Sequence, residues 1–187
     1  MSSTVYKFDM NSAKSHNRIA LVDEADQIVG YEDKLLVHQR GLLHRAFSAV
    51  VINTKGQWLM HRRALDKYHS GGAWTNTCCS HLTQGESMAE ATRNRLFAEM
   101  GIVANPEFIE SFYYRAEFDN GLTENEIDHV FLARWDGDPD PDPGEVMDWK
   151  WSSPEEIEEA LIKHPEEFSA WFPRIYQLLQ PILSDQS

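Results

Sequence analysis

Hydrophobic residues recur along the chain at two spacings, and each spacing predicts one kind of element. Short apolar runs that are rich in β-branched and aromatic residues and bounded by turn residues are typical of strands. They predict strands at 19–29 (two short strands around a polar turn), 46–52, 58–60, about 108–117, about 124–135 and 147–151. The turn at 53–56 is expected to join 46–52 to 58–60 as a hairpin.

Helix signals fall in three segments. Residues 87–100 carry apolar side chains near helical spacing, with Ser87 placed as an N-cap and Gly101 where a helix would stop. A second helix is expected to begin after Ser153, and a third covers roughly 166–181. Together the pattern predicts an α+β fold, a mixed sheet of several strands flanked by helices.

Composition sets the class of protein. The 187 residues suit one domain and are enough to bury a core. No apolar run approaches the length of about 20 residues that a membrane helix needs, and the first residues lack the layout of a secretion signal, so we expect a cytoplasmic location and no membrane partner. Acidic residues outnumber basic ones 30 to 17, which argues against nucleic acid as a partner. An anionic substrate would need a local cluster of Lys and Arg.

Two pairs of residues share the spacing that puts both side chains on one face of a strand. Cys79 and His81 are one pair, and Glu124 and Glu126 are the other. Two carboxylates on a buried face are stable only if one is protonated or a cation lies between them. The alternative is an exposed hairpin edge just after a turn. The adjacent Cys78 is expected to be a reduced, buried thiol.

The positions of three histidines favour a cation between the two glutamates. His38 and His44 precede the 46–52 strand, and with His81 and the two glutamates they can form a roughly octahedral site. Imidazole suits manganese, iron and zinc, and carboxylates suit harder ions. A lone histidine is more often structural, so spacing alone leaves both readings open. The remaining histidines are expected to be structural or exposed: His16, His61, His69, His129 and His164.

The segment 80–102 carries part of a diphosphate-binding motif. Glu86, Glu99, Gly101 and Ile102 stand at the offsets of a Nudix box, whose carboxylates hold Mg²⁺ against a diphosphate. Three places depart from that box: Ser80 replaces its first glycine, Asn94-Arg95 replaces its Arg-Glu pair, and Ala98 replaces a paired glutamate. Because a hydrolase needs those carboxylates to activate water, the helix resembles a Nudix scaffold that has lost its hydrolytic set.

Five basic residues can grip a diphosphate: Lys34, Arg62, Arg63, Lys67 and Arg95. The arginine fork matches phosphate oxygens, although a solvated basic loop is an equally good reading of 62–67. The acidic stretch 136–145 is expected to be a solvated loop, and composition alone makes Trp74 and Trp171 core residues.

In combination these pieces resemble type I isopentenyl-diphosphate Δ-isomerases, of the Nudix superfamily, over about residues 18–175. The matching pieces are Lys34…His38, residues 41–48 (GLLHRAFS), Arg62-Arg63-Ala64-Leu65…Lys67, residues 74–81 (WTNTCCSH), Gly85-Glu86-Ser87, Tyr114-Arg115-Ala116, Glu124-Asn125-Glu126 and residues 148–151 (DWKW). The cysteine-containing and Glu-Asn-Glu pieces are the specific ones. Leu82 departs from the family, which often has proline there.

The resemblance implies a flavin-independent isomerase of isoprenoid biosynthesis that interconverts isopentenyl and dimethylallyl diphosphate. It implies Cys79 and Glu126 as acid/base groups, Tyr114 as a proton relay, and Trp171 as the aromatic face under a transient cation. It implies one manganese or zinc ion on His38, His44, His81, Glu124 and Glu126, and Mg²⁺ that Glu99 helps to hold with the diphosphate. The diphosphate contacts would be Lys34, Arg63, Lys67 and Arg95, in a monomer or weak homodimer. The rivals are a nucleotide pyrophosphohydrolase and a non-catalytic module in which Cys79 ligates a structural zinc.

Overall fold

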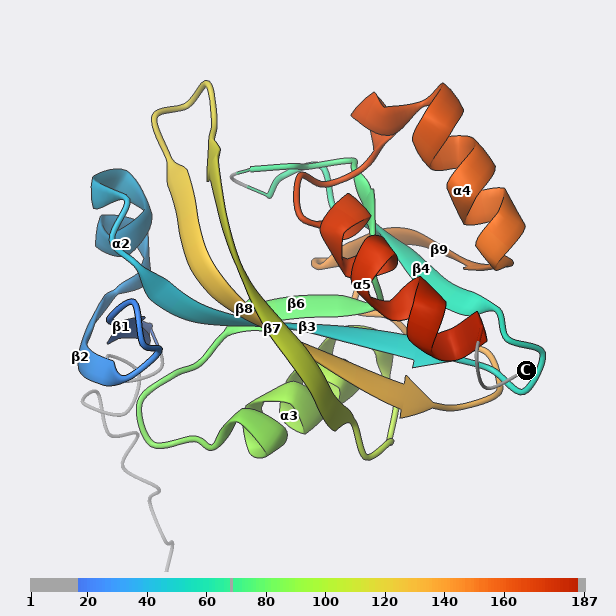
Figure 1. Ribbon diagram of the computed structural model, residues 1–187, viewed down its shortest axis with the longest axis horizontal. Helices are drawn as coiled ribbons and strands as arrows, with labels where there is room; N and C mark the ends of the chain where they lie inside the picture. Colours follow the sequence, from blue (N-terminus) through green and yellow to red (C-terminus); the bar gives the residue numbers. More distant parts are fainter. Residues whose placement is uncertain (1–16, 68, 185–187) are drawn as a thin grey trace, which may run out of the picture.

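A curled sheet of nine strands, counted over the described residues 17–67 and 69–184, forms the centre of the computed structural model (Figure 1). The strands are β1 (Arg18–Val22), β2 (Ile28–Asp33), β3 (His44–Ile52), β4 (Trp58–Arg63), β5 (Trp74–Thr75), β6 (Cys78–His81), β7 (Glu107–Glu117), β8 (Thr123–Arg134) and β9 (Val146–Ser152). β3 pairs in parallel with β8 along its whole length and antiparallel with β6. The sheet is therefore mixed, as predicted.

Helices cover both faces of this sheet. α3 (Met88–Met100) lies on one face, and α4 (Pro154–Lys163) and α5 (Phe172–Ser184) lie on the other (Figure 1). Ala49 and Val51 of β3 pack with α3, whereas Val50 and Ile52 pack with α4 and α5. Because β3 is buried on both faces, its apolar run is continuous rather than alternating. This layered α+β arrangement confirms the predicted fold class. None of the helices among the described residues is long and apolar enough to cross a lipid bilayer.

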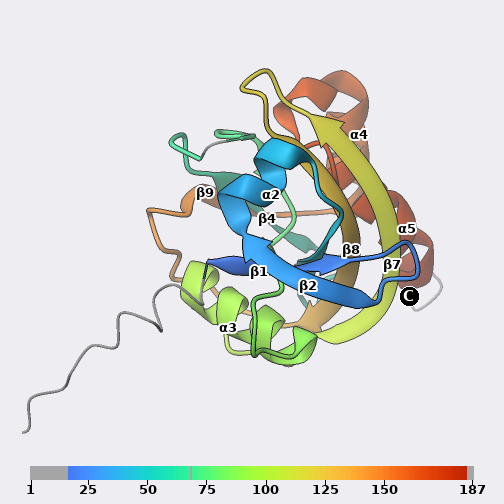
Figure 2. The same cartoon turned by 90° about the vertical axis from the view of Figure 1, so that its left-hand side faces the viewer.

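A short helix that the sequence pattern missed lies at the end of the sheet formed by β1 and β2, which faces the viewer in Figure 2. This helix, α2 (Lys34–Arg40), has only seven residues, too few for apolar periodicity to show. Asp33 caps its N-terminus by accepting hydrogen bonds from two backbone N–H groups, and Gly41 ends it with φ +59°. α2 buries His38 and places Lys34 in the lining of a pocket.

The predicted last helix begins later than expected. Residues Pro165–Glu167 form a single 3-10 turn, η1, and α5 starts only at Phe172. The intervening segment begins with extended backbone at Phe168, which bridges Trp74 in parallel, and Ser169 N donates to the Trp74 carbonyl at 2.9 Å. Residues 170–171 then form a turn. Tertiary pairing with β5 thus overrides helical propensity, and it leaves Trp171 just before α5 rather than within a helix.

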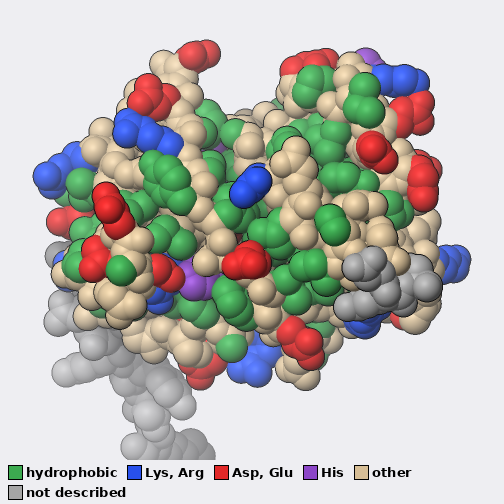
Figure 3. Space-filling model, in the orientation of Figure 1, with side chains coloured by type: hydrophobic (Ala, Val, Ile, Leu, Met, Phe, Trp, Pro, Cys, Tyr) green, Lys and Arg blue, Asp and Glu red, His purple; other side chains and the backbone are tan. Residues whose placement is uncertain are grey.

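Most other predicted elements agree closely with the structure, but β2 runs four residues beyond the predicted end at 29, because it pairs with β1 as far as Asp33. The capping boxes at Ser87 and Ser153 both form, and the hairpin of β3 and β4 closes through the pair Ile52 and Trp58. β4 runs three residues beyond its predicted end because it pairs with β9 as far as Arg63. On the face shown in Figure 3, acidic and basic side chains are interspersed.

The end of α3 meets the acidic loop through one glycine. Gly101 has φ +68°, and a Cβ there would lie 2.9 Å from the Asp140 carbonyl oxygen. Gly56 has φ +74° but no atom within 4 Å of such a Cβ. We expect Gly56→Ala to lower the free energy of unfolding by about 1–2 kcal/mol, from the left-handed backbone alone. Gly101→Ala is expected to cost about 1–3 kcal/mol more because the backbone at Asp140 must also move. Urea denaturation of both variants measures the difference, and equal losses would contradict this account.

Candidate active site

The register of three neighbouring strands brings the predicted site residues together. His44 of β3 lies opposite Glu126 of β8, and Ser48 of β3 lies opposite Cys79 of β6. Since side chains alternate along a strand, His81 shares a face with Cys79. All of these side chains therefore belong to one face of the sheet, and they meet in a pocket there.

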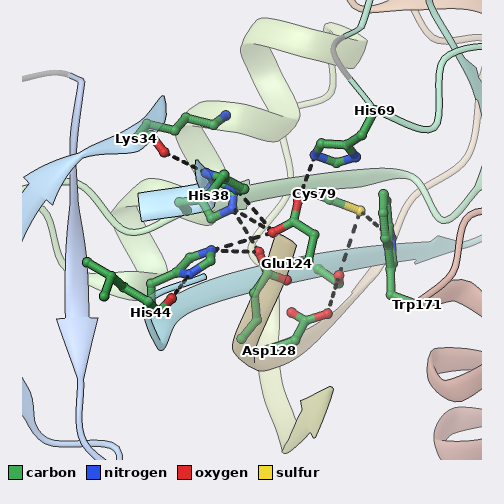
Figure 4. Close-up of polar contacts among 12 residues, drawn as sticks. Lys34, His38, His44, His69, Cys79, Glu124, Asp128 and Trp171 are labelled. Carbon is green, nitrogen blue, oxygen red and sulfur yellow. Dashed lines mark hydrogen bonds and ion pairs between the residues drawn. The ribbon is translucent and has the colours of Figure 1, made fainter. Parts of the chain in front are cut away.

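The two glutamates of β8 are buried, so the alternative of an exposed hairpin edge is wrong. Glu124 is 2% exposed and Glu126 is 4% exposed. His38 Nε2 lies 3.0 Å from Glu124 Oε2, and the Nε2 atoms of His44 and His81 lie 3.1 and 2.8 Å from Glu126 Oε1 (Figure 4). One potential ligand atom from each of these five residues lies within 4.8 Å of every other.

The donor set fits a divalent cation. Glu124 Oε2 accepts no hydrogen bond among the described residues, although three imidazole nitrogens approach it within 3.9 Å. The Nδ1 atoms of His38 and His44 face the carbonyls of Lys34 and Leu42 at 2.6 and 2.8 Å. Because a carbonyl only accepts, each Nδ1 carries the proton and each Nε2 is available to a metal. Three imidazoles and two carboxylates suit manganese, iron or zinc.

The pKa values of the clustered residues also indicate that the site favours positive charge. Burial opposes protonation of His44, but the carboxylates of Glu124 and Glu126 beside its ring raise its pKa to about 10. Burial on its own would raise the pKa of both glutamates, yet the surrounding histidines hold them below the ordinary value. The carboxylates are thus ionised, and without a metal a proton on His44 balances part of their charge. Binding a cation would displace that proton.

Cys79 lies outside this cluster, and its sulfur is surrounded by hydrogen-bonding groups. The thiol donates to Asn76 Oδ1 at 3.1 Å, and Trp171 Nε1 donates to the sulfur at 3.2 Å. Burial, followed by the nearby Asp128, raises the pKa of the thiol to about 12. Cys79 is therefore a protonated thiol near neutral pH. It is not part of the five-residue cluster, so the idea of a structural zinc site with Cys79 as ligand lacks support.

A third buried carboxylate follows the two glutamates on β8. Asp128 is 2% exposed, and Ser48 Oγ lies 2.7 Å from its Oδ2. Burial and the neighbouring Glu126 raise the pKa of Asp128 well above its ordinary value, which favours the protonated form. Ser48 Oγ also lies 3.7 Å from the Cys79 sulfur, which links this acid to the thiol. The alternation Glu124, Glu126, Asp128 was visible in the sequence, but the third member was not singled out.

The basic residues predicted to contact a diphosphate line the same pocket. Lys34, Arg63, Lys67 and Arg95 all face it, so the loop at 62–67 is not merely solvated.

Two of these basic residues pair with carboxylates. Arg95 pairs with Glu99 at 2.6 Å, and Lys67 forms an ion pair with Glu145. Contrary to the prediction, the acidic stretch 136–145 is therefore not solvated throughout, because its last residue, Glu145, makes this ion pair. Burial raises the pKa of Glu99, and Arg95 opposes that rise.

Two aromatic residues complete the lining. Trp171 is 4% exposed, and Arg63 lies over its ring with 5.3 Å between Cζ and the centroid. Tyr114 of β7 lies opposite Glu126, and burial, followed by the charges of Glu126 and Glu124, raises the pKa of its hydroxyl. The positions of both residues are compatible with the predicted roles, which remain predictions.

The other histidines divide into two groups. His61 is buried with its Nδ1 3.0 Å from the Thr77 carbonyl, His129 pairs with Asp26, and His164 is exposed, as predicted. His16 lies outside the described residues. His69 is different: it is 8% exposed and its Nε2 lies 2.6 Å from Glu124 Oε1. No spacing signal in the sequence connects positions 69 and 124, which is why this contact was missed.

Comparisons with known proteins give a consistent result. A model of the NUDIX domain matches residues 42–172. Isopentenyl-diphosphate Delta-isomerase 2 of Aromatoleum aromaticum is 46% identical over 155 residues, which is 83% of this chain and 82% of that protein. The Isopentenyl-diphosphate Delta-isomerase of Photobacterium profundum is 45% identical over 175 residues, 90% of this chain and 97% of its own. A crystal structure of a Deinococcus radiodurans protein matches with a TM-score of 0.70 at 20% identity, over 86% of this chain and 97% of that one, which shows a shared fold.

Burial of a neutral histidine makes stability depend on pH. Burial, with the charge of Arg63, lowers the pKa of His61 from 6.5 to about 4. Between these values the unfolded chain binds a proton that the folded chain excludes, so stability falls as pH drops from about 6.5 to about 4. The full contribution is about 3 kcal/mol. We expect His61→Gln to weaken this loss and the exposed His164→Gln to leave it unchanged, as measured by urea denaturation across that range. A His61→Gln profile parallel to the wild type would refute the assignment.

Proposed function

The chain belongs to the NUDIX-domain family and groups with the isopentenyl-diphosphate Delta-isomerases, and we propose that it interconverts isopentenyl and dimethylallyl diphosphate. The reaction moves one carbon–carbon double bond by adding a proton at one carbon and removing a proton from another. It needs an acid, a base, an anchor for the diphosphate and protection of the cationic carbon from water.

One observation supports the proposal most directly. Cys79 and Glu126 lie on the two strands that flank β3, and both side chains line the same pocket. The thiol holds its proton, whereas the carboxylate has lost its own. A single pocket thus contains one proton donor and one proton acceptor from different strands, which is the pair that the reaction requires.

The proton steps follow from the electron count. Protonation of the terminal carbon C4 uses the π pair of the alkene and leaves a tertiary cation at C3. Loss of a proton from C2 returns the C–H electron pair as the new double bond between C2 and C3. In this account Cys79 and Glu126 exchange their protonation states with each turnover, and Tyr114, which lies opposite Glu126, would pass a proton during the reset.

The carboxylate is held for this task by its surroundings. His44 and His81 approach Glu126 Oε1 within 3.1 Å. A divalent ion bound by the five clustered residues would orient Glu126 and lower its basicity. Glu126 would then act through a fixed oxygen rather than as a freely rotating group.

The rim of the pocket supplies the anchor. Lys34, Arg63, Lys67 and Arg95 would bind the diphosphate, and Glu99 would help to hold Mg²⁺ that accompanies it. Binding energy from this remote group would then position the hydrocarbon end against the thiol and the carboxylate. The buried indole of Trp171 would shield the transient cation and stabilise it through its ring face.

The competing hydrolase activity has less support from the same pocket. α3 contains two carboxylates, and Glu90 is used in the capping box, so Glu99 is the one that α3 presents to the site. A single carboxylate from this helix gives poor support for the metal cluster that would activate water.

Incubation with isopentenyl diphosphate in deuterated water tests the function itself. We expect NMR to show dimethylallyl diphosphate with deuterium in a methyl group, because the added proton comes from exchangeable protein groups. Release of phosphate without labelled product would instead indicate a hydrolase and overturn the proposal.

The two cysteines offer a matched pair of variants. Cys79→Ala and Glu126→Gln are expected to lower kcat by about 10²- to 10⁴-fold, the usual contribution of general acid–base catalysis. Cys78→Ser should stay within a few-fold of the wild type, because that thiol lies against α3 on the opposite face of the sheet and the serine hydroxyl keeps a hydrogen-bonding group beside Glu99. Circular dichroism checks the fold, and elemental analysis checks that Glu126→Gln retains metal. Near-normal turnover in Cys79→Ala would remove the thiol from the mechanism.

A further inference from the structure

We infer that His69 is a positioning residue that fixes how Glu124 presents itself to the metal. The inference rests on the metal centre described above and adds a residue outside the five-member cluster. His69 would donate a hydrogen bond to one oxygen of Glu124 and so leave the other oxygen as the single ligand atom. It would also connect the metal centre to the loop that carries the diphosphate contacts.

The contact itself is short and buried. His69 Nε2 lies 2.6 Å from Glu124 Oε1, and the side chains are 5% and 3% exposed (Figure 4). At that depth water competes little for the carboxylate, so a single donor has a large effect on its orientation. A terminal carboxylate torsion has broad preferences, and a hydrogen bond is what selects one rotation.

The two oxygens of Glu124 are used differently. Oε1 faces His69, whereas Oε2 lies 3.0, 3.5 and 3.9 Å from the Nε2 atoms of His38, His44 and His81. Oε2 is also the atom that accepts no hydrogen bond among the described residues. This division points to a carboxylate that binds the ion through Oε2 alone.

Packing holds the His69 ring in place from two sides. The ring stacks on Phe118 at 4.8 Å between centroids, with 18° between planes, and meets the edge of Trp171 at 6.0 Å. Phe118 follows β7 and Trp171 precedes α5, so three distant segments meet at this imidazole. A ring so confined delivers its N–H in one direction.

The backbone at His69 ties the ring to the diphosphate loop. Arg63 Nη2 donates to the His69 carbonyl at 3.3 Å, and Lys67 stands two residues before it. A Cβ at Gly71 would lie 2.5 Å from the Leu65 carbonyl oxygen, so these two residues approach closely.

The test compares three variants for metal binding without substrate. His69→Phe retains an aromatic ring for Phe118 but has no donor, and His69→Gln restores an N–H. His129→Phe is the matched control, since it removes a histidine that is 2.7 Å from Asp26 and lies outside the pocket. Metal-stripped proteins are titrated with Mn²⁺, with free ion followed by electron paramagnetic resonance. Co²⁺ loading gives the visible spectrum of the site.

We expect His69→Phe to weaken Mn²⁺ binding by about 10- to 100-fold, as for partners of other metal ligands, and to change the Co²⁺ spectrum. His69→Gln should recover most of the affinity, and His129→Phe should match the wild type. Wild-type affinity and spectrum in His69→Phe would overturn the inference while leaving the metal centre intact. Wild-type protein that binds neither ion would overturn both. Should His69→Phe not fold, His69→Ala carries the same comparison.

Discussion

Two ionised carboxylates held side by side in the interior are the constraint around which this site is built. Glu124 and Glu126 are both almost fully buried, and water cannot screen their repulsion. Three histidines from α2, β3 and β6 supply the compensating groups. The β3–β8 pairing then serves two purposes, because it forms the middle of the core and sets His44 against Glu126.

Different structural elements supply the residues for proton transfer and for diphosphate binding. Groups that would exchange protons or hold the ion come mainly from strands β3, β6 and β8, where register limits their movement. Groups that would bind the diphosphate come from the beginning of α2, the end of β4, the following loop, and α3. Rigid strands suit chemistry that depends on atomic distances, and loops suit recognition of a charged group. Trp171 and His69 stand between the two sets and contact both.

Much of this arrangement was predictable from the sequence, for reasons specific to each element. Long strands and helices with clear caps were placed within one or two residues, and alternate spacing put Cys79 with His81 and Glu124 with Glu126 on common faces. The resemblance to a family added residues that spacing could not connect, although it said nothing of His69. The structure places those residues around one pocket, while their roles remain to be tested.

What escaped prediction depended on distant contacts. α2 is too short for periodicity, and the segment before α5 is extended because it pairs with Trp74. His69 and Glu124 are separated by more than fifty positions, and only the folded loop brings them together. Asp128 is the exception, since the alternation on β8 already pointed to it. Its raised pKa, however, follows from burial, which no local pattern reveals.

The position of α2 means that a bound ion would affect folding as well as catalysis. This helix belongs to the first part of the described chain. Its buried residues are Val37 and His38, and its Lys34 lines the pocket. An ion shared by His38 and the glutamates of β8 would join that helix to the sheet as a removable cross-link. Folding of the N-terminal end would then be coupled to ion occupancy. Scarcity of the metal would weaken the attachment of the helix that carries Lys34 and His38, so local structure and the site would be affected together.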